Sequence, residues 1–259
     1  MTADETAPRD PKSIDIYPTF LLGISTAWHN LGRLLVADLI VAVPTGALMV
    51  IGCPTILSLG MHVGPAPYPD IPVNEWIALG GCVVFGLGLW TWTYAAVFLM
   101  ADAALAGKPM PGVREACGAA LDRVPALLGA YLCVVSLSVV GSLFCMVPGI
   151  VAGIAFAFAP VRAVTRGSGP IQALWESFGL TRRRWWRIIG YFVLVSLCIQ
   201  AIYLPIAVPL SLLSTVIGPL PVVMIVLLLA LSTLLGVFQQ VCLVALHRRL
   251  EQRGPAVAA

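Results

Sequence analysis

Long apolar stretches constrain the fold of this chain more than any other feature. A helix that crosses the hydrocarbon core of a bilayer needs about 20 mainly apolar residues. Six stretches meet that requirement, at residues 34–60, 76–103, 125–147, 149–165, 188–213 and 219–246. Apolar residues make up 59% of the 259-residue chain and charged residues only 10%, whereas a soluble domain has about 25% charged residues. The sequence therefore predicts an all-α integral membrane protein, a bundle of six membrane-spanning helices.

The basic residues are distributed on one side of these six stretches. All 15 Lys and Arg residues lie before the first stretch, after the second, at or after the end of the fourth, or after the last. The other side consists of residues 61–75, the turn after the third stretch and residues 214–221, and it has no basic residue. Because cytoplasmic connections are enriched in Lys and Arg, we predict that both termini are cytoplasmic.

A threefold pattern accompanies the spans. Three stretches, which start at Ser25, Arg114 and Gln172, each begin with a short amphipathic piece, pass one or more arginines and enter an odd-numbered span. Such a repeat predicts three helical hairpins, each preceded by an amphipathic helix in the cytoplasmic interface. The predicted organisation is a disordered cytoplasmic N-terminus at 1–18, a single six-span domain at 19–250 and a disordered tail at 251–259.

The connection between the third and fourth spans is the shortest in the chain. It reads MVPG, and proline is well suited to the first turn of a helix, so Pro148 is predicted to be the first residue of the fourth helix. Pro148 and Gly149 are the predicted hairpin turn. Gly149, Gly153 and Ala157 then recur every four residues, a spacing of small residues that lets helices approach closely.

Asp38 and Asp102 are acidic residues inside predicted spans, where a charge is costly and usually faces the protein interior. Both recur at seven-residue spacing with small or polar residues, which favours a helix-contact face. They are candidate proton or cation sites. The favoured interpretation is a structural ion pair with an arginine, either Arg162 or Arg33, because both acids lie near the interface. Asp38, Asp102 and Arg162 are thus the candidate intramembrane polar residues.

The most basic segment is LTRRRWWRIIGY, at the start of the fifth span. Its candidate lipid-headgroup residues are Arg182, Arg183, Arg184, Arg187, Trp185 and Trp186. Arginine next to a membrane attracts anionic lipid by about 1 kcal/mol per residue, and tryptophan prefers the headgroup level. An anchor that fixes orientation is the favoured interpretation, and a specific headgroup site is the second. Nucleic-acid binding is not expected because no soluble domain is predicted.

Motifs of known chemistry are missing from the sequence. There is no HExxH, GxSxG or Walker motif and no GxGxxG after a strand. The seven cysteines have no CxxC spacing, and no two of the three histidines share a membrane depth with a pair of carboxylates. We predict no enzyme activity, no metal and no cofactor. An intramembrane enzyme that acts on lipids is the weakest alternative.

The segment from Val147 to Leu194 carries a resemblance to a known group. It has a PG turn, a span, a GxGP joint, an ALxxSxxLT-like helix and an Arg/Trp start to the next span. The matching positions are Pro148, Gly149, Gly169, Pro170, Ala173, Leu174, Ser177, Leu180, Thr181, Arg184 and Trp185. This pattern resembles six-span bacterial membrane proteins that include YciC-like inner-membrane proteins and the membrane domain attached to some glycerophosphodiester phosphodiesterases. The resemblance implies a helical membrane domain of largely uncharacterised role, without the phosphodiesterase activity.

These observations lead to one expected function and one alternative. We expect a non-enzymatic, multi-pass protein of the bacterial inner membrane, a scaffold or accessory subunit that contacts anionic phospholipid on its cytoplasmic face. Its expected partners are membrane lipids and either another integral membrane protein or a second copy of the chain. The alternative is a small transporter or channel component that uses Asp38 and Asp102.

Overall fold

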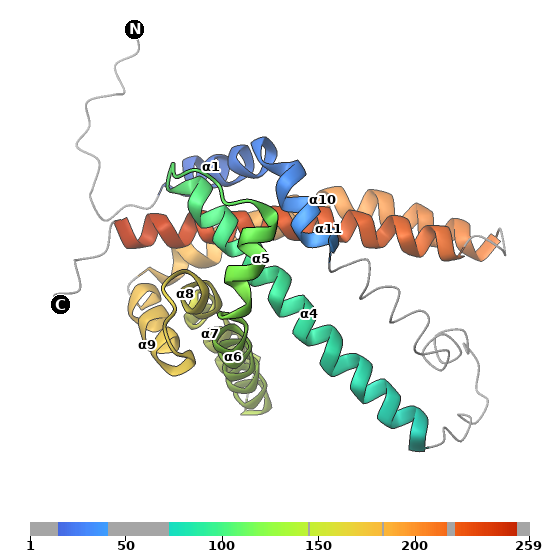
Figure 1. The fold of residues 1–259 in the computed structure, drawn as a ribbon, viewed down its shortest axis with the longest axis horizontal. Helices are drawn as coiled ribbons and strands as arrows, with labels where there is room; N and C mark the ends of the chain where they lie inside the picture. The colour runs from blue at the N-terminus through green and yellow to red at the C-terminus, as the bar shows by residue number, and fades with distance from the viewer. Residues whose placement is uncertain (1–14, 41–72, 145, 183, 217–220, 253–259) are drawn as a thin grey trace, which may run out of the picture.

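A computed structural model of the protein describes residues 15–40, 73–144, 146–182, 184–216 and 221–252. These residues form helices and connecting loops, and no strand occurs among them. A helical run at residues 31–40 follows the first helix after a turn at Asn30. The labelled helices are α1 (Ile16–His29), α4 (Val73–Leu105), α5 (Val113–Leu121), α6 (Val124–Phe144), α7 (Met146–Ala155), α8 (Ala159–Thr165), α9 (Pro170–Thr181), α10 (Trp185–Val216) and α11 (Pro221–Gln252) (Figure 1).

Five helical segments within the described residues are long and apolar enough to cross a membrane. They are Gly80–Leu105, Val124–Leu143, Pro148–Thr165, Trp185–Leu210 and Leu227–Gln252. Each overlaps one of the last five predicted stretches, which confirms that the described part of the chain is helical and compatible with a multi-pass membrane protein. The first predicted stretch, 34–60, falls largely on residues 41–72, outside the described part. Most of the two predicted tails, 1–18 and 251–259, also lies outside it.

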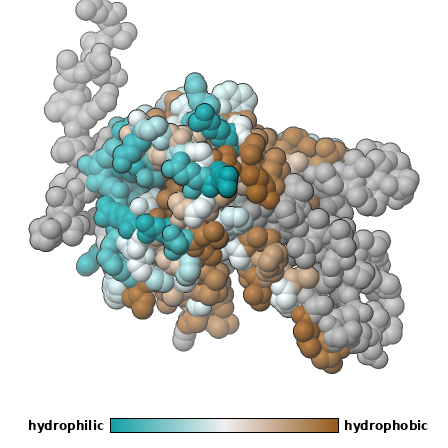
Figure 2. Space-filling view, viewed as in Figure 1, coloured by the Kyte–Doolittle hydropathy of each residue, from teal (hydrophilic) through white to brown (hydrophobic). Residues whose placement is uncertain are grey.

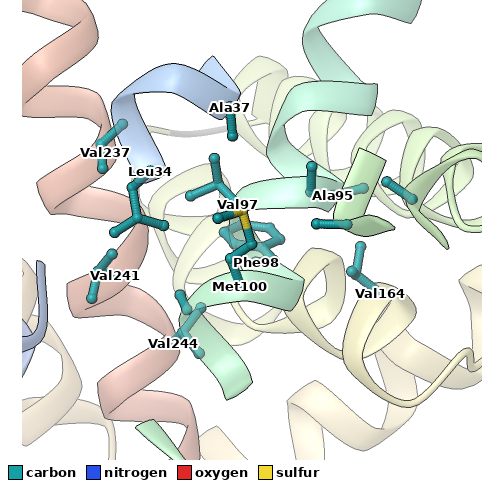
Figure 3. Packing of buried hydrophobic residues seen from close by; sticks show 14 of the residues in the cluster. Leu34, Ala37, Ala95, Val97, Phe98, Met100, Val164, Val237, Val241 and Val244 are labelled. Atoms are coloured by element: carbon teal, nitrogen blue, oxygen red, sulfur yellow. The ribbon is translucent and has the colours of Figure 1, made fainter. Parts of the chain in front are cut away.

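The buried core lies where α4, α11 and residues 31–40 meet. Figure 3 shows side chains from these three segments in one cluster, with Val164 of α8 beside them. Leu34, Phe98 and Met100 are fully buried there. The core therefore packs residues 31–40, near the start of the described chain, against α11, its last described helix.

The helices that leave this core expose apolar side chains to their surroundings. In Figure 1, α4, the α6–α7 pair and the α10–α11 pair extend in different directions. Leu143 of α6 is 80% exposed and Leu197 of α10 is 62% exposed. Figure 2 shows hydrophobic residues along these extensions and hydrophilic residues gathered on the opposite side of the molecule. Large apolar surfaces are rare on soluble monomers, so these faces suit contact with lipid or with another membrane helix.

Two hydroxyl side chains of α9 form hydrogen bonds with backbone groups at the break between α7 and α8. The Ser177 hydroxyl donates a hydrogen bond to the Ala155 carbonyl (2.9 Å) and accepts one from the Phe158 backbone N–H (3.3 Å). The Thr181 hydroxyl donates to the same Ala155 carbonyl at 3.2 Å. Both side chains are fully buried. Buried backbone groups need hydrogen-bond partners. At this break, α9 supplies the partners that these backbone groups would have found within a continuous helix.

We predict that Ser177→Ala lowers the free energy of unfolding by about 1–3 kcal/mol, because it leaves the buried Phe158 N–H without its acceptor. Thermal unfolding in detergent, followed by circular dichroism, measures the change. Ser196→Ala is the matched control, since Ser196 is exposed on α10 and its loss should change stability by less than about 0.5 kcal/mol. Equal stability of the two variants would contradict the role assigned to Ser177.

Candidate functional site

An arginine of α8 joins three helices at the hydrophilic end of the molecule. The Arg162 guanidinium contacts a Glu176 oxygen on α9 through Nη1, and its Nη2 lies 2.9 Å from Glu251 Oε1 on α11. The Arg166 Nη2 reaches the same Glu251 oxygen at 2.7 Å. The Arg162 side chain is only 7% exposed, and the two carboxylates are about one quarter exposed. Two arginines and two glutamates therefore balance one another in charge and connect α8, α9 and α11.

Helical spacing explains how each helix presents these groups together. Gln172 and Glu176 are four residues apart on α9, and the Gln172 amide donates a hydrogen bond of 2.9 Å to Glu176 Oε1. His247 and Glu251 have the same spacing on α11, with His247 Nε2 3.4 Å from Glu251 Oε1. Residues four apart share one face of a helix. Glu176 is thus oriented by a neighbour on its own helix, and Glu251 lies on the same face of α11 as His247.

The imidazole of His247 lies inside this network and is 1% exposed. Its ring centre is 6.0 Å from that of Phe158, and neither ring nitrogen has a hydrogen-bond partner among the described residues. No group of three or more His, Cys, Asp or Glu side chains in that part of the chain could hold a metal ion. The contacts of His247 are those of a packed side chain beside an ion-pair network.

Asp102 forms an ion pair outside the Arg162 network. Its Oδ1 lies 2.6 Å from Arg248 Nε, which joins the end of α4 to the end of α11. The sequence-based interpretation of a structural ion pair holds for Asp102, but both predicted partners, Arg162 and Arg33, were wrong. Arg162 is committed to two glutamates, and α11 is a direct neighbour of α4. The negative charge of Asp102 is therefore already compensated within the chain.

We predict a coupling free energy of about 1 kcal/mol between Asp102 and Arg248, the value typical of a partly exposed ion pair. The two side chains are 28% and 23% exposed. A double-mutant cycle with Asp102→Asn, Arg248→Met and the double variant measures this coupling by unfolding in detergent. Additive effects of the two substitutions would show that the pair contributes nothing.

Asp38 lies in a different setting from Asp102. It is half-buried in the helical run 31–40. Its carboxylate is near enough to Tyr94 of α4 for an electrostatic interaction, and the side chain of Gln240 on α11 is another polar neighbour of Tyr94. Gln240 is 4% exposed, and its Oε1 has no hydrogen-bond partner within the described residues. The structure thus separates the two aspartates that the sequence grouped together. Asp38 belongs to a polar contact beside the core, and Asp102 belongs to an ion pair.

The predicted arginine–tryptophan cluster lies at the junction of α9 and α10. Arg182 follows the last residue of α9, and α10 begins at Trp185 without an acidic residue in its first turn. Trp186 is 85% exposed. Arg184 and Arg187 belong to the same junction, and Arg183 lies outside the described part of the chain. A helix N-terminus has a partial positive charge of its own, which adds to the positive charge of the exposed Arg182.

Small residues bring α6 and α7 into close contact at the predicted hairpin. A Cβ atom at Gly149 would lie 2.8 Å from the Ser138 carbonyl oxygen and 2.9 Å from the Ser142 backbone nitrogen. The sequence predicted Pro148 and Gly149 as the hairpin turn, with Pro148 as the first residue of the helix. In the structure they are the third and fourth residues of α7, inside its first turn. The missing N–H of Pro148 still falls in the first helical turn, where no partner is required. Gly149 has contacts that leave no room for a side chain.

Sequence reasoning missed the acidic partners of the Arg162 network. Glu176 and Glu251 are the only two acidic residues after Asp122, and both lie on the side predicted to hold every basic residue. This scarcity of acids was the available signal, because a buried arginine near the interface needs a carboxylate from the same side. It would have pointed to both glutamates.

Comparisons with known proteins identify a family but no function. A family model described as a domain of unknown function (DUF7847) matches residues 34–250. No curated protein and no solved structure matches the chain. The matched range includes Arg162, Glu176, Asp102 and Arg248, and it ends one residue before Glu251.

Proposed function

We propose that this chain, which belongs to the DUF7847 family of unknown function, is a non-enzymatic multi-pass protein of the bacterial inner membrane. It acts as a scaffold or accessory subunit and contacts anionic phospholipid with its cytoplasmic face. Six spans with both termini in the cytoplasm are part of this proposal. The resemblance to YciC-like inner-membrane proteins supports the same architecture.

One observation carries the proposal: Arg182 and Trp186 are both exposed at the start of α10. Arg182 is exposed and forms no ion pair with any described residue, in contrast to Arg162, Arg166 and Arg248. Trp186 beside it is 85% exposed. A free guanidinium attracts lipid phosphates, and an exposed indole is stable at the headgroup level. The junction therefore has the chemistry of a surface that contacts anionic lipid.

Exposed apolar residues on the short helices support an interfacial position. On α1, Tyr17 and Trp28 are each 68% exposed. On α9, Ile171 and Trp175 are four residues apart and 68% and 70% exposed, whereas Ser177 on the other face is fully buried. A helix with one face packed on the protein and an apolar face outward suits the boundary between headgroups and acyl chains.

The transporter alternative is less well supported. Asp102, one of its two proposed ion-binding residues, is paired with Arg248, so a substrate cation would have to compete with a guanidinium. Cation or proton flux into proteoliposomes that disappeared with Asp38→Asn would favour this alternative over a scaffold.

Lipid selectivity of the full chain tests the proposed function. The protein is reconstituted into nanodiscs of phosphatidylcholine with a minor fraction of phosphatidylglycerol, and the lipids kept after gentle extraction are identified by native mass spectrometry. We expect phosphatidylglycerol to be enriched around the wild-type chain. Combined Arg182→Gln, Arg183→Gln, Arg184→Gln and Arg187→Gln substitution should abolish most of that enrichment.

A charge-matched control distinguishes the cluster from general attraction by the basic side. It combines Arg33→Gln, Lys108→Gln, Arg114→Gln and Arg249→Gln, which also removes four positive charges but at other positions. This control should keep most of the enrichment, because its charges are dispersed and lack neighbouring tryptophans. Unchanged enrichment in the cluster variant would remove lipid contact from the proposal.

A further inference from the structure

A groove of about 690 Å³ lies between α7 and α10, and residues of the arginine–tryptophan junction form part of its lining. Its walls are Ile150, Val151 and Ile154 from α7 and Ile189 from α10, and its remaining lining residues are Arg182, Trp185 and Trp186. The volume is within the range of about 300–1,000 Å³ that is typical of small-molecule sites. Four aliphatic side chains form the apolar part, and a guanidinium with two indoles forms the polar part.

The lining sets three requirements for an occupant. The aliphatic walls require an apolar segment, because water in contact with them is unfavourable. Arg182 has no ion-pair partner among the described residues, so the occupant should bring a negative charge. Trp185 and Trp186 have indole faces for an apolar chain and N–H donors for a headgroup, as tryptophans at membrane interfaces do.

An anionic phospholipid meets all three requirements with one molecule. Inorganic phosphate would satisfy Arg182 and leave the aliphatic walls uncovered. A helix from a second copy would cover the walls but would have to place a carboxylate at Arg182, and this chain has only 12 acidic residues in total. Phospholipid is also the molecule that surrounds any chain with five apolar, membrane-length helices.

We infer that this groove binds one anionic glycerophospholipid, with an acyl chain between α7 and α10 and its phosphate on Arg182. This inference rests on the proposed function, because it assigns a defined site to the contact between the basic face and anionic lipid. Ile154 also packs against the core cluster that contains Ile188 and Tyr191. A bound acyl chain would therefore stabilise the contact of α7 with α10 in addition to covering the groove.

The experiment compares variants that block the groove with variants that remove the charge. Ile150→Trp fills the groove and leaves every arginine in place; Ile150 is 51% exposed, so the larger side chain should not disturb the core. Val151→Trp is a second groove-blocking variant. Val193→Trp is the control, because Val193 is 50% exposed on α10 and does not line the groove. Native mass spectrometry counts phosphatidylglycerol and phosphatidylcholine retained by the full chain from mixed nanodiscs.

We expect the wild type and Val193→Trp to retain one phosphatidylglycerol molecule per chain. Ile150→Trp and Val151→Trp should lose that molecule while the weaker enrichment of anionic lipid around the chain persists. Arg182→Gln should keep a lipid in the groove but lower the preference for phosphatidylglycerol over phosphatidylcholine about fivefold, the effect of one basic residue at a membrane surface.

Three results would overturn the inference. They differ in whether the proposed function fails with it. Retention of phosphatidylglycerol by both groove-blocking variants would reject the groove, and the proposed function would stand if the cluster variant still lost enrichment. Equal retention of the two lipids by the wild type would reject the anionic headgroup and the proposed function together. A wild-type dimer that became monomeric with Ile150→Trp would identify a second copy as the occupant.

Discussion

Replacing Arg162 with methionine is expected to lower the free energy of unfolding by about 3 kcal/mol, the lower end of the cost of removing one partner from a buried ion pair. The substitution leaves Glu176 and Glu251 facing each other without the guanidinium that lies between them, and both carboxylates are about three quarters buried. The contact of α8 with α9 and α11 should weaken as a result. Thermal unfolding in detergent, with circular dichroism as the signal, measures the loss.

Two further variants separate lost charge from lost packing at Arg162. Arg166→Met removes a 52%-exposed arginine that contacts the same Glu251 oxygen, and exposed pairs contribute only about 0–1 kcal/mol. Adding Glu176→Gln and Glu251→Gln to Arg162→Met should restore much of the stability, because no uncompensated buried charge remains. The assignment fails if Arg162→Met and Arg166→Met have equal effects, or if the triple variant is less stable than Arg162→Met alone.

Gly149→Ala is expected to destabilise the α6–α7 contact by about 1–3 kcal/mol, the usual cost of overpacking. The added methyl group would lie under 3 Å from two backbone atoms, the Ser138 carbonyl oxygen at 2.8 Å and the Ser142 nitrogen at 2.9 Å. A flexible side chain could move aside, but these backbone atoms belong to a helix. The helices would have to separate, which unfolding experiments in detergent would detect as a lower melting temperature.

Gly153→Ala provides the control on the same helix face. A Cβ atom at Gly153 would have Ser138 Oγ as its nearest neighbour at 3.6 Å, an ordinary contact. Because alanine favours a helix over glycine by about 1 kcal/mol, this variant should be as stable as the wild type or more stable. If Gly149→Ala and Gly153→Ala behaved alike, close packing at Gly149 would not be what holds α6 against α7.

The long apolar helices and the junction of α6 with α7 could be predicted from the sequence because they depend on local properties. Apolar length and the position of proline and glycine determined the segments that became α4, α6, α10 and α11. The MVPG segment likewise identified the place where α6 and α7 meet. These features need only the residues of one segment and the thickness of a bilayer.

The polar partners could not be predicted in the same way because they depend on how distant helices meet. Asp102 and Arg248 are 146 residues apart, and Arg162 and Glu251 are 89 apart. Their pairing follows from the packing of α4 and α8 near the end of α11, which charge and hydropathy patterns alone do not specify. The sequence did single out Asp102 and Arg162, but it assigned neither its actual partner.

For Ser177 and Thr181, the sequence indicated a motif but not the hydrogen bonds that the two residues form. Their positions were part of the resemblance to a bacterial membrane family, and the structure shows both hydroxyls bonded to the Ala155 carbonyl. The need for these hydroxyls arises from the break between α7 and α8. That break is not evident in an apolar run that is long enough to form one continuous helix.

The central claim, that the start of α10 contacts anionic phospholipid, is tested most directly by fluorescence quenching. Phosphatidylglycerol or phosphatidylcholine with brominated acyl chains is added at equal mole fraction to bilayers that contain the full chain. The signal of Trp185 and Trp186 is obtained by subtracting the emission of the Trp185→Phe, Trp186→Phe variant. Stronger quenching by brominated phosphatidylglycerol, reduced by Arg182→Gln, is the predicted result. Equal quenching by the two lipids would contradict the claim.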